Sequence, residues 1–308
     1  MLHYLIPMRF RFLLVFVALA AVSCSGRKIP VMDWDSVISG YRDDETRVDY
    51  LKVAELNLAL AMKGRLAEDM FCYTQAGAAG LIPEWNRTEE VGGLASDIFY
   101  AVGHVAYAQR MAFEANVLGE EAYNPRMMFR LIETNLLFGA YEVAEKYISI
   151  LRGDGYVFPD YSRFLYNDAA VAADPVFGDL LKCIPAADRI ALEDGIENDL
   201  AVILRANPQH RVTMEYLGAY YLLDCNMDAF KAFLDEFYGT QALPALPRSF
   251  AEAACMLSEL EKGYWKTVGV DKKIYERYRD FKSRLENGLS EAKYKNTFWY
   301  YIMRANSQ

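Results

Sequence analysis

Apolar residues recur at three- and four-residue spacing along almost the whole chain, and alternating runs bounded by turn residues are hard to find. This spacing gathers apolar side chains on one face of a helix, whereas a half-buried strand alternates residue by residue. The pattern therefore predicts an all-α fold of antiparallel helical hairpins. The predicted helices cover residues 46–62, 66–79, 93–102, 104–118, 125–138, 141–152, 160–172, 175–183, 187–205, 210–223, 227–238, 248–262, 271–287 and 290–303.

The predicted hairpin around Gly139 carries the most informative motif of the chain. The glycine ends one helix, and Tyr141 and Ala144 follow two and five residues later, at the start of the next helix. Glycine relieves the tight turn, the aromatic ring packs on the preceding helix, and the small residue lets the helices approach closely. The same spacing starts at Gly103, 36 residues upstream, and at Gly64, 39 residues earlier still.

This motif resembles the turn between the helices of a tetratricopeptide repeat, a family with a usual period of about 34 residues. The resemblance covers residues 46–156 and implies stacked helix pairs that form a solenoid. Residues 157–308 are expected to form a less regular helical hairpin region packed on the repeats. Ile132 and Asn135 depart from the family pattern in the first helix. An ordinary α-hairpin with a glycine turn is the alternative interpretation.

The N-terminus has the layout of a signal peptide over residues 1–23. Arg9 and Arg11 form a positive segment, residues 12–22 are apolar, and small residues lead into Cys24. The apolar stretch is shorter than the roughly 20 residues of a membrane-spanning helix. The residues before Cys24 resemble a lipobox, which implies cleavage there and attachment of lipid to the thiol. An ordinary signal peptide cut nearby is the alternative.

Residues 24–45 are expected to form a tether and a short N-terminal segment. Within it, Asp35-Ser36-Val37 resembles the O-glycan acceptor of Bacteroidota lipoproteins, although Asp35 or Ser36 could instead cap a short helix. Lipoproteins displayed on the cell surface of Bacteroidota resemble one another in acidic runs after the anchor, whereas Arg27 and Lys28 are basic here. We therefore expect a lipid-anchored protein at the periplasmic side of the outer or inner membrane.

Further segments resemble a group of Bacteroidota lipoproteins, namely residues 133–136, 144–147, Asn207-Pro208 and 296–301. This resemblance implies the cell envelope and no particular activity. The formal net charge is −9 and becomes more negative when Arg9 and Arg11 leave with the signal. An acidic body is repelled by nucleic acid and by anionic lipid. We expect no nucleic-acid partner, and membrane contact through the lipid on Cys24 alone.

Few residues suit catalysis. His104 and His210 are the histidines that follow the signal segment, and each is predicted to begin a helix. A histidine metal site or a Ser-His-Asp triad would therefore depend on a single histidine. No phosphate-binding loop, zinc-protease motif or hydrolase motif occurs. We expect no catalytic residue, no cofactor and no metal.

The remaining cysteines, Cys72, Cys183, Cys225 and Cys255, show no CxxC spacing. They are expected to behave as small buried hydrophobic residues. A disulfide between Cys225 and Cys255 stays open as an alternative, because the periplasm is oxidising.

Aromatic residues leave a second function open. The chain has 22 tyrosines, and aromatic residues cluster at 156–166, 216–221, 264–265 and 298–301. Tyrosine and tryptophan give binding surfaces large rigid contacts, although packing between helices also explains such clusters. An aromatic platform with paired carboxylates, such as Glu142 and Glu145, would suit a glycan-binding or glycan-cleaving envelope protein. Solvated acids on a helix face are the simpler interpretation of these carboxylates.

The leading functional prediction is a binding scaffold. Stacked helix pairs expose a concave surface formed by the first helix of each pair, and such surfaces bind peptides or proteins. The residues expected to face this groove are Arg126, Phe129, Glu133 and Leu137. Their mixed charge and apolar contact suit a peptide, although core packing is the alternative for Phe129 and Leu137. We expect a lipid-anchored helical-repeat scaffold that binds a protein or peptide partner at the periplasmic face.

Overall fold

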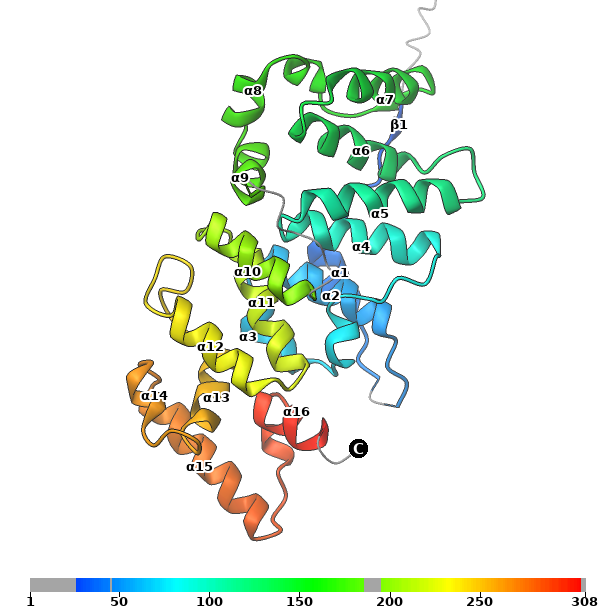
Figure 1. Cartoon of the computed structure of the whole chain (residues 1–308). Coiled ribbons are helices and arrows are strands. Elements are labelled where there is room, and N and C mark those ends of the chain that lie inside the picture. Colours follow the sequence, from blue (N-terminus) through cyan, green and yellow to red (C-terminus); the bar gives the residue numbers. More distant parts are fainter. Residues whose placement is uncertain (1–25, 45, 186–194, 306–308) are drawn as a thin grey trace, which may run out of the picture.

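A computed structural model describes residues 26–44, 46–185 and 195–305, and Figure 1 shows them as an elongated stack of helices. The predicted all-α class is confirmed, with β1 (Arg27–Lys28) and β2 (Tyr156–Val157) as the two short strands in this part of the chain. The predicted signal peptide and the lipidation site at Cys24 lie outside the described residues.

Helices make up most of the described chain. They are α1 (Trp34–Gly40), α2 (Tyr50–Met62), α3 (Leu66–Asp69), α4 (Glu89–Ala101), α5 (Val105–Leu118), α6 (Pro125–Leu137), α7 (Tyr141–Gly153), α8 (Asp168–Ala173), α9 (Pro175–Cys183), α10 (Ile196–Ala206), α11 (Arg211–Leu223), α12 (Met227–Phe237), α13 (Arg248–Leu257), α14 (Tyr264–Thr267), α15 (Lys272–Glu286) and α16 (Phe298–Ala305). Short 3₁₀ helices are η1 (Met70–Cys72), η2 (Gly77–Gly80), η3 (Tyr161–Phe164) and η4 (Ala292–Tyr294).

From α4 to α7, each helix packs on the next one in the sequence. The pairs α4 with α5, α5 with α6 and α6 with α7 are in contact. On α5, Ala108, Ala112 and Ala115 are fully buried. A Cβ atom added at Gly92 of α4 would lie 3.0 Å from the Cβ atom of Ala115. Small residues therefore set the close approach of these helices, and the stack is a solenoid of helical hairpins.

One turn geometry joins several of these hairpins. Gly64, Gly103 and Gly139 have φ values of +69°, +78° and +68°, a conformation that favours glycine. The amide of Gly139 donates to the carbonyl of Leu136 at 3.2 Å, and the next amide donates to that of Asn135 at 2.8 Å. Equivalent bonds occur after Gly64 and Gly103. These bonds satisfy carbonyls at the helix end and reverse the chain.

The same turn recurs in the C-terminal half without a glycine. Cys225 has a φ of +55° between α11 and α12. Its amide donates to the carbonyl of Leu222 at 3.1 Å, and the amide of Asn226 donates to that of Tyr221 at 2.9 Å. A search for glycine spacing misses this hairpin, because a cysteine occupies the left-handed position.

Several predicted helices are shorter than the apolar pattern indicates. The helix predicted over residues 248–262 ends with α13 at Leu257, and the one over 290–303 is divided into η4 and α16. The helix predicted over residues 66–79 stops after η1, where the side chain of Gln75 donates to the carbonyl of Met70 at 2.6 Å. The helix predicted over residues 160–172 is divided into η3 and α8, with Tyr166 at a φ of +55° between them. The apolar pattern shows which face of a helix is buried. It does not predict these last two helix ends, because they depend on a side-chain hydrogen bond and on a backbone turn.

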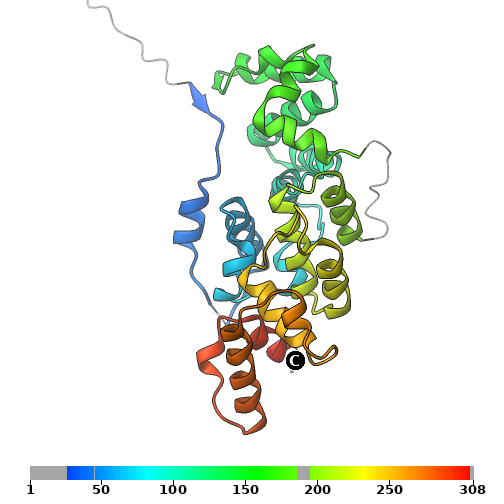
Figure 2. The same cartoon turned by 90° about the vertical axis from the view of Figure 1, so that its left-hand side faces the viewer.

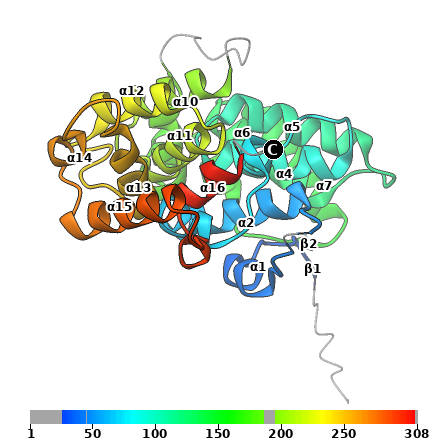
Figure 3. The same ribbon diagram turned by 90° about the horizontal axis from the view of Figure 1, so that it is seen from below.

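The N-terminal segment, residues 26–44, lies along one face of the stack (Figures 2 and 3). Its strand β1 pairs in parallel with β2, with Arg27 opposite Tyr156. The helix α1 agrees with the alternative of a short helix for Asp35-Ser36-Val37. Its cap is Asp33, which accepts from the amide of Ser36 at 3.4 Å, rather than Asp35 or Ser36. Asp35 instead pairs with Lys63, the residue directly after α2, at 2.5 Å.

Candidate functional site

Three of the four predicted groove residues lie together. Arg126, Phe129 and Glu133, all on α6, line one pocket of about 300 Å³. Leu137 does not belong to this lining, although it was expected there, and it is 6% exposed within the hydrophobic core. It sits on the last turn of α6, and α6 contacts α9. Core packing therefore accounts for Leu137.

Charged side chains around this pocket pair with one another. Arg126 forms a short ion pair with Asp97 of α4. Arg130 bridges Asp97 at 3.2 Å and Glu133 at 2.7 Å. The hydroxyl of Tyr161 donates to Glu133 at 3.2 Å. Two arginines and two carboxylates thus balance each other, so the pocket has no strong preference for either sign of charge.

Burial dominates the electrostatics of this network. It raises the pKa of Glu133, an effect that the nearby guanidinium of Arg130 opposes. That guanidinium also lies 3.6 Å from the centre of the Tyr100 ring. The Nε atom of Arg130 and the hydroxyl of Tyr100 are buried without a hydrogen-bond partner among the described residues. An acceptor that entered beside Arg130 would satisfy a donor that is otherwise unpaired.

Apolar contact comes from aromatic residues of a neighbouring segment. The ring of Phe129 stacks on Tyr161 at 5.2 Å and meets the edge of Phe158 at 5.6 Å. The aromatic cluster near residue 160 is visible in the sequence. By contrast, Asp97 carries no local signal, because it reaches the pocket from a different helix.

The chain's own N-terminal segment fills the remaining side of this groove. Ile29, Met32 and Trp34 line the same pocket as Arg126 and Phe129. Ile29 is 8% exposed, and the amide of Arg27 donates to the carbonyl of Gly155 at 3.0 Å. An extended polypeptide therefore lies against the face that the sequence predicts to bind peptides.

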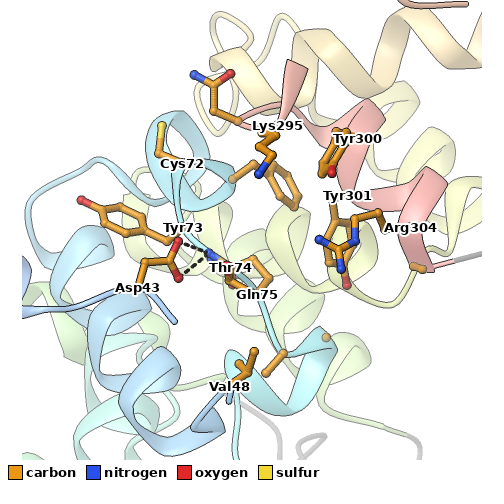
Figure 4. Close-up of a pocket in the computed structure, with 15 residues that line it drawn as sticks. Asp43, Val48, Cys72, Tyr73, Thr74, Gln75, Lys295, Tyr300, Tyr301 and Arg304 are labelled. Carbon is orange, nitrogen blue, oxygen red and sulfur yellow. Dashed lines mark hydrogen bonds between the residues drawn. The ribbon is translucent and has the colours of Figure 1, made fainter. Parts of the chain in front are cut away.

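A second and larger cavity lies where the loop after η1 meets α16 (Figure 4). Its volume is about 580 Å³, within the range of roughly 300–1,000 Å³ found for small-molecule sites. Its lining comes mainly from two segments far apart in sequence, residues 71–77 and residues 295–305, together with Asp43 and Val48. Its aromatic wall consists of Phe71, Tyr73, Tyr300 and Tyr301. The polar side chains of its lining are Asp43, Cys72, Thr74, Gln75, Lys295, Asn296 and Arg304.

Hydrogen bonds and ring contacts fix the walls of this cavity. The carboxylate of Asp43 accepts from the amide of Thr74 at 3.1 and 3.2 Å. The hydroxyl of Tyr301 donates to the carbonyl of Leu223 at 2.7 Å, and the Phe71 ring lies 5.1 Å from the Tyr301 ring. The late aromatic run of the sequence points to Tyr300 and Tyr301. Only the fold brings residues 71–77 against them.

A cysteine, a histidine and an aspartate also meet near the turn at Gly103. His104 caps α5 by accepting from the amide of Tyr107 at 3.4 Å, and its Nε2 lies 3.0 Å from Asp199. Cys183 lines the same small cavity as His104. Burial raises the pKa of the Cys183 thiol to about 11. Since both nitrogens of His104 are engaged and the thiol stays protonated at neutral pH, this group lacks an activated nucleophile.

Two buried glutamates link distant helices. Glu215 accepts from the amide of Leu66 at 2.9 Å, and Glu252 accepts from the amide of Phe298 at 2.9 Å. Burial raises the pKa of each carboxyl to about 7. Such values suit acid–base chemistry, but these side chains are 4% and 1% exposed. Their observed role is to cap helices that start elsewhere in the chain.

The other chemical expectations have simple outcomes. Glu142 and Glu145 are exposed on α7, away from the lining of either cavity. Cys72, Cys183, Cys225 and Cys255 are free thiols, so Cys225 and Cys255 form no disulfide. Cys183 and Cys255 are buried as expected, whereas Cys72 is exposed and Cys225 is only partly buried. Within the described ranges, no group of three or more His, Cys, Asp or Glu side chains is arranged to hold a metal ion. No helix in these ranges has the length and apolar character needed to cross a membrane.

Comparison with known proteins gives one match. A family described as a family of unknown function, DUF6057, matches residues 29–305. No curated protein and no solved structure matches the chain.

Proposed function

The chain belongs to this family of unknown function, and we propose from its groove that it is a lipid-anchored scaffold that binds a protein or peptide partner at the periplasmic face of the cell envelope. One observation carries the proposal. The face of α6 that bears Arg126, Phe129 and Glu133 already holds an N-terminal segment, residues 27–34, which is extended up to the start of α1.

The contacts of this segment are those that a peptide ligand would use. One part adds a strand beside β2, which supplies main-chain hydrogen bonds, and Ile29 places an apolar side chain in the pocket. The pairing extends over two residues per strand, so the segment is held by a small number of contacts. A partner with a similar apolar residue could replace it without remodelling the helices.

The proposed anchor places this groove close to the membrane. One residue separates Cys24 from Gly26, where the described chain begins. Two peptide units span at most about 7 Å. A lipid on Cys24 would therefore hold the segment end near the bilayer, and its release from the groove would lengthen the tether. In cells fed a labelled fatty acid, we expect the wild-type protein to carry the label and Cys24→Ala to lose it. Equal labelling would argue against the anchor.

The groove is tested with a labelled peptide of residues 26–34 and the full-length protein. We expect Ile29→Asp to release the segment, because it forces a charge into a site that is 8% exposed. This variant should bind the peptide at least roughly tenfold more tightly than the wild type, whose own segment competes at high effective concentration. Fluorescence anisotropy measures the affinity.

Val176→Asp on α9 is the matched control, since Val176 is 57% exposed and lines neither this groove nor the larger cavity. It introduces the same charge and should bind the peptide as weakly as the wild type. If a folded Ile29→Asp protein, checked by circular dichroism, shows no gain in peptide binding, the groove is not a peptide site.

A further inference from the structure

We propose that this protein associates head to tail with further copies of itself, so that a surface on α5 of one copy binds a surface on α14 and α15 of the next. The first, the apolar–acidic surface, consists of Phe113, Glu114, Val117, Leu118, Glu120 and Glu121. The second, the aromatic–basic surface, consists of Trp265, Lys266, Lys272, Tyr275 and Arg279. Both are separate from the groove, and this contact does not depend on the function proposed there.

The first argument is the apolar area left in water near the end of α5. Phe113, Val117 and Leu118 are 55%, 62% and 42% exposed. Helical spacing places Phe113 beside Val117, because the two are four residues apart. Neighbouring exposed apolar side chains of this size mark an interaction site on a soluble protein. Contact with a partner would remove this area from water.

Carboxylates border this apolar area. Glu114 lies on α5 itself, and Glu120 and Glu121 follow in the loop that joins α5 to α6. None of the three forms an ion pair within the described ranges. The nearby cation Arg110 lies 5.4 Å from the ring of Tyr107 on its own helix. The surface therefore combines apolar contact with an excess of negative charge.

The aromatic–basic surface has a rigid apolar centre. The rings of Trp265 on α14 and Tyr275 on α15 stack at 4.5 Å with 12° between their planes, and both residues are partly exposed. The ammonium group of Lys266 lies 5.4 Å from the Trp265 ring. Tryptophan, tyrosine and arginine contribute most of the binding energy at many protein interfaces. Because the two rings already pack on each other, little conformational freedom is lost when a partner covers them.

Positive charge surrounds these two rings. Together, α14 and α15 carry seven Lys and Arg residues against three Asp and Glu residues, in a protein with a net charge of −9. Helical spacing places Lys272 and Arg279 beside Tyr275. Lys272 pairs with Glu276 at 3.5 Å, whereas Lys266 and Arg279 have no ion pair in the described part of the chain. This surface therefore complements the apolar–acidic surface in charge.

The charges also decide how two copies meet. A contact between two identical surfaces would bring like charges together, whereas a contact between unlike surfaces pairs opposite charges. Figures 1 and 3 place α14 and α15 at the opposite end of the body from the loop that joins α5 to α6. The two surfaces of one chain therefore cannot meet each other. A contact between unlike surfaces can repeat from copy to copy, which gives a ring or a filament.

A protein surface suits the aromatic–basic surface better than a lipid bilayer does. A helix that lies in a bilayer inserts its apolar side. The apolar side of α15 includes Tyr278 and Phe281, which are buried, and α15 contacts α13. The exposed side is therefore left for a partner outside the membrane.

Sedimentation velocity of the full-length protein measures association as its concentration rises. At low salt the sedimentation coefficient should increase with concentration, and high salt should reduce this increase because it screens the charges. Glu120→Lys/Glu121→Lys and Lys266→Glu/Arg279→Glu should each associate at least roughly tenfold more weakly than the wild type. An equimolar mixture of the two variants should associate again, since each keeps the surface that the other has lost.

Two further variants separate the apolar contact from the overall charge. Phe113→Ala should weaken association at low and at high salt, because it removes apolar area and no charge. Glu142→Lys/Glu145→Lys on α7 is the matched control, since it makes the same change in charge at exposed positions outside both surfaces. It should associate as the wild type does. Circular dichroism checks the fold of each variant.

Four outcomes would overturn the proposal. One is a wild type that stays monomeric at low salt at every concentration. The second is a charge-reversed variant that associates alone as strongly as the wild type, which would indicate contact between identical surfaces. The third is a mixture of the two variants that stays monomeric. The fourth is binding of polyglutamate by a wild type that does not self-associate, which would assign the aromatic–basic surface to a different acidic partner.

Discussion

The two halves of the solenoid are held together by different kinds of contact. From α4 to α7, each helix packs on the next, through buried alanines and tight glycine turns. From α11 to α16, buried side chains reach segments far away in the sequence. Glu215 binds an amide 149 residues away, and the indole nitrogen of Trp299 donates to the carbonyl of Glu252 at 2.7 Å. The first half is stabilised by local contacts, and the second by contacts that only the complete fold can make.

The largest expected effect lies in the second half, at Gly218. A Cβ atom at this position of α11 would overlap the ring of Phe250, which is fully buried on α13. Gly218→Ala should therefore lower the free energy of unfolding by about 2–3 kcal/mol through overpacking. Urea denaturation measures the change.

The matched control is Gly153→Ala at the end of α7. An added Cβ atom there meets nothing within 4 Å. It should be neutral, or stabilising by up to about 1 kcal/mol from helix propensity. Equal effects of the two substitutions would mean that the α11–α13 contact is looser than the structure indicates.

A pH-dependent effect is expected at Glu252. Burial raises its folded-state pKa to about 7, against roughly 4.3 when unfolded. The folded protein therefore binds this proton more tightly than the unfolded chain does. The stabilisation that results is fully present below about pH 4.3 and is lost as the pH rises through 7. Glu252→Gln cannot ionise. The free energy of unfolding of Glu252→Gln minus that of the wild type should therefore increase by about 1–3 kcal/mol from pH 5 to pH 8.

Comparison of the two proteins isolates this carboxyl group. Burial lowers the pKa of His104 and of His210, so these histidines make the protein more stable as the pH rises, opposite to Glu252. Their effect is the same in the variant and the wild type, and it therefore cancels in the difference between the two. Glu286→Gln, at an exposed position of α15, should show no such change. A pH-independent difference between Glu252→Gln and the wild type would show that Glu252 does not titrate in this range.

The smallest effects are expected at the turns, with opposite signs in the two halves. Gly139→Val should destabilise by about 1 kcal/mol or more, because a side chain disfavours the positive φ although nothing within 4 Å obstructs it. Cys225→Gly should stabilise by up to about 1 kcal/mol, since the left-handed position is then occupied by glycine. Thermal unfolding of both variants tests the pair. A destabilised Cys225→Gly protein would show that packing of the thiol outweighs backbone strain.

Local patterns in the sequence account for the helices and for several turns. Three- and four-residue spacing predicts the hairpin of α6 and α7 closely, because each helix buries one stripe against a neighbour in the chain. The same spacing predicts a helix over 66–79 that the fold ends early. There, the side-chain amide of Asn57 donates to the carbonyl of Gly80 at 2.8 Å and helps to hold a loop. Such a bond links residues 23 positions apart and leaves no periodic trace.

The two candidate sites also differ in how much of each the sequence predicts. The sequence by itself determined the α-helical class, the glycine turns and the groove residues on α6, since helical spacing alone puts Arg126, Phe129 and Glu133 on one face. Only the tertiary structure decided that the N-terminal segment fills that groove and that the loop after η1 meets the final helix to form the larger cavity. Spacing within one helix is fixed by backbone geometry, whereas contacts between distant segments depend on how the whole chain packs.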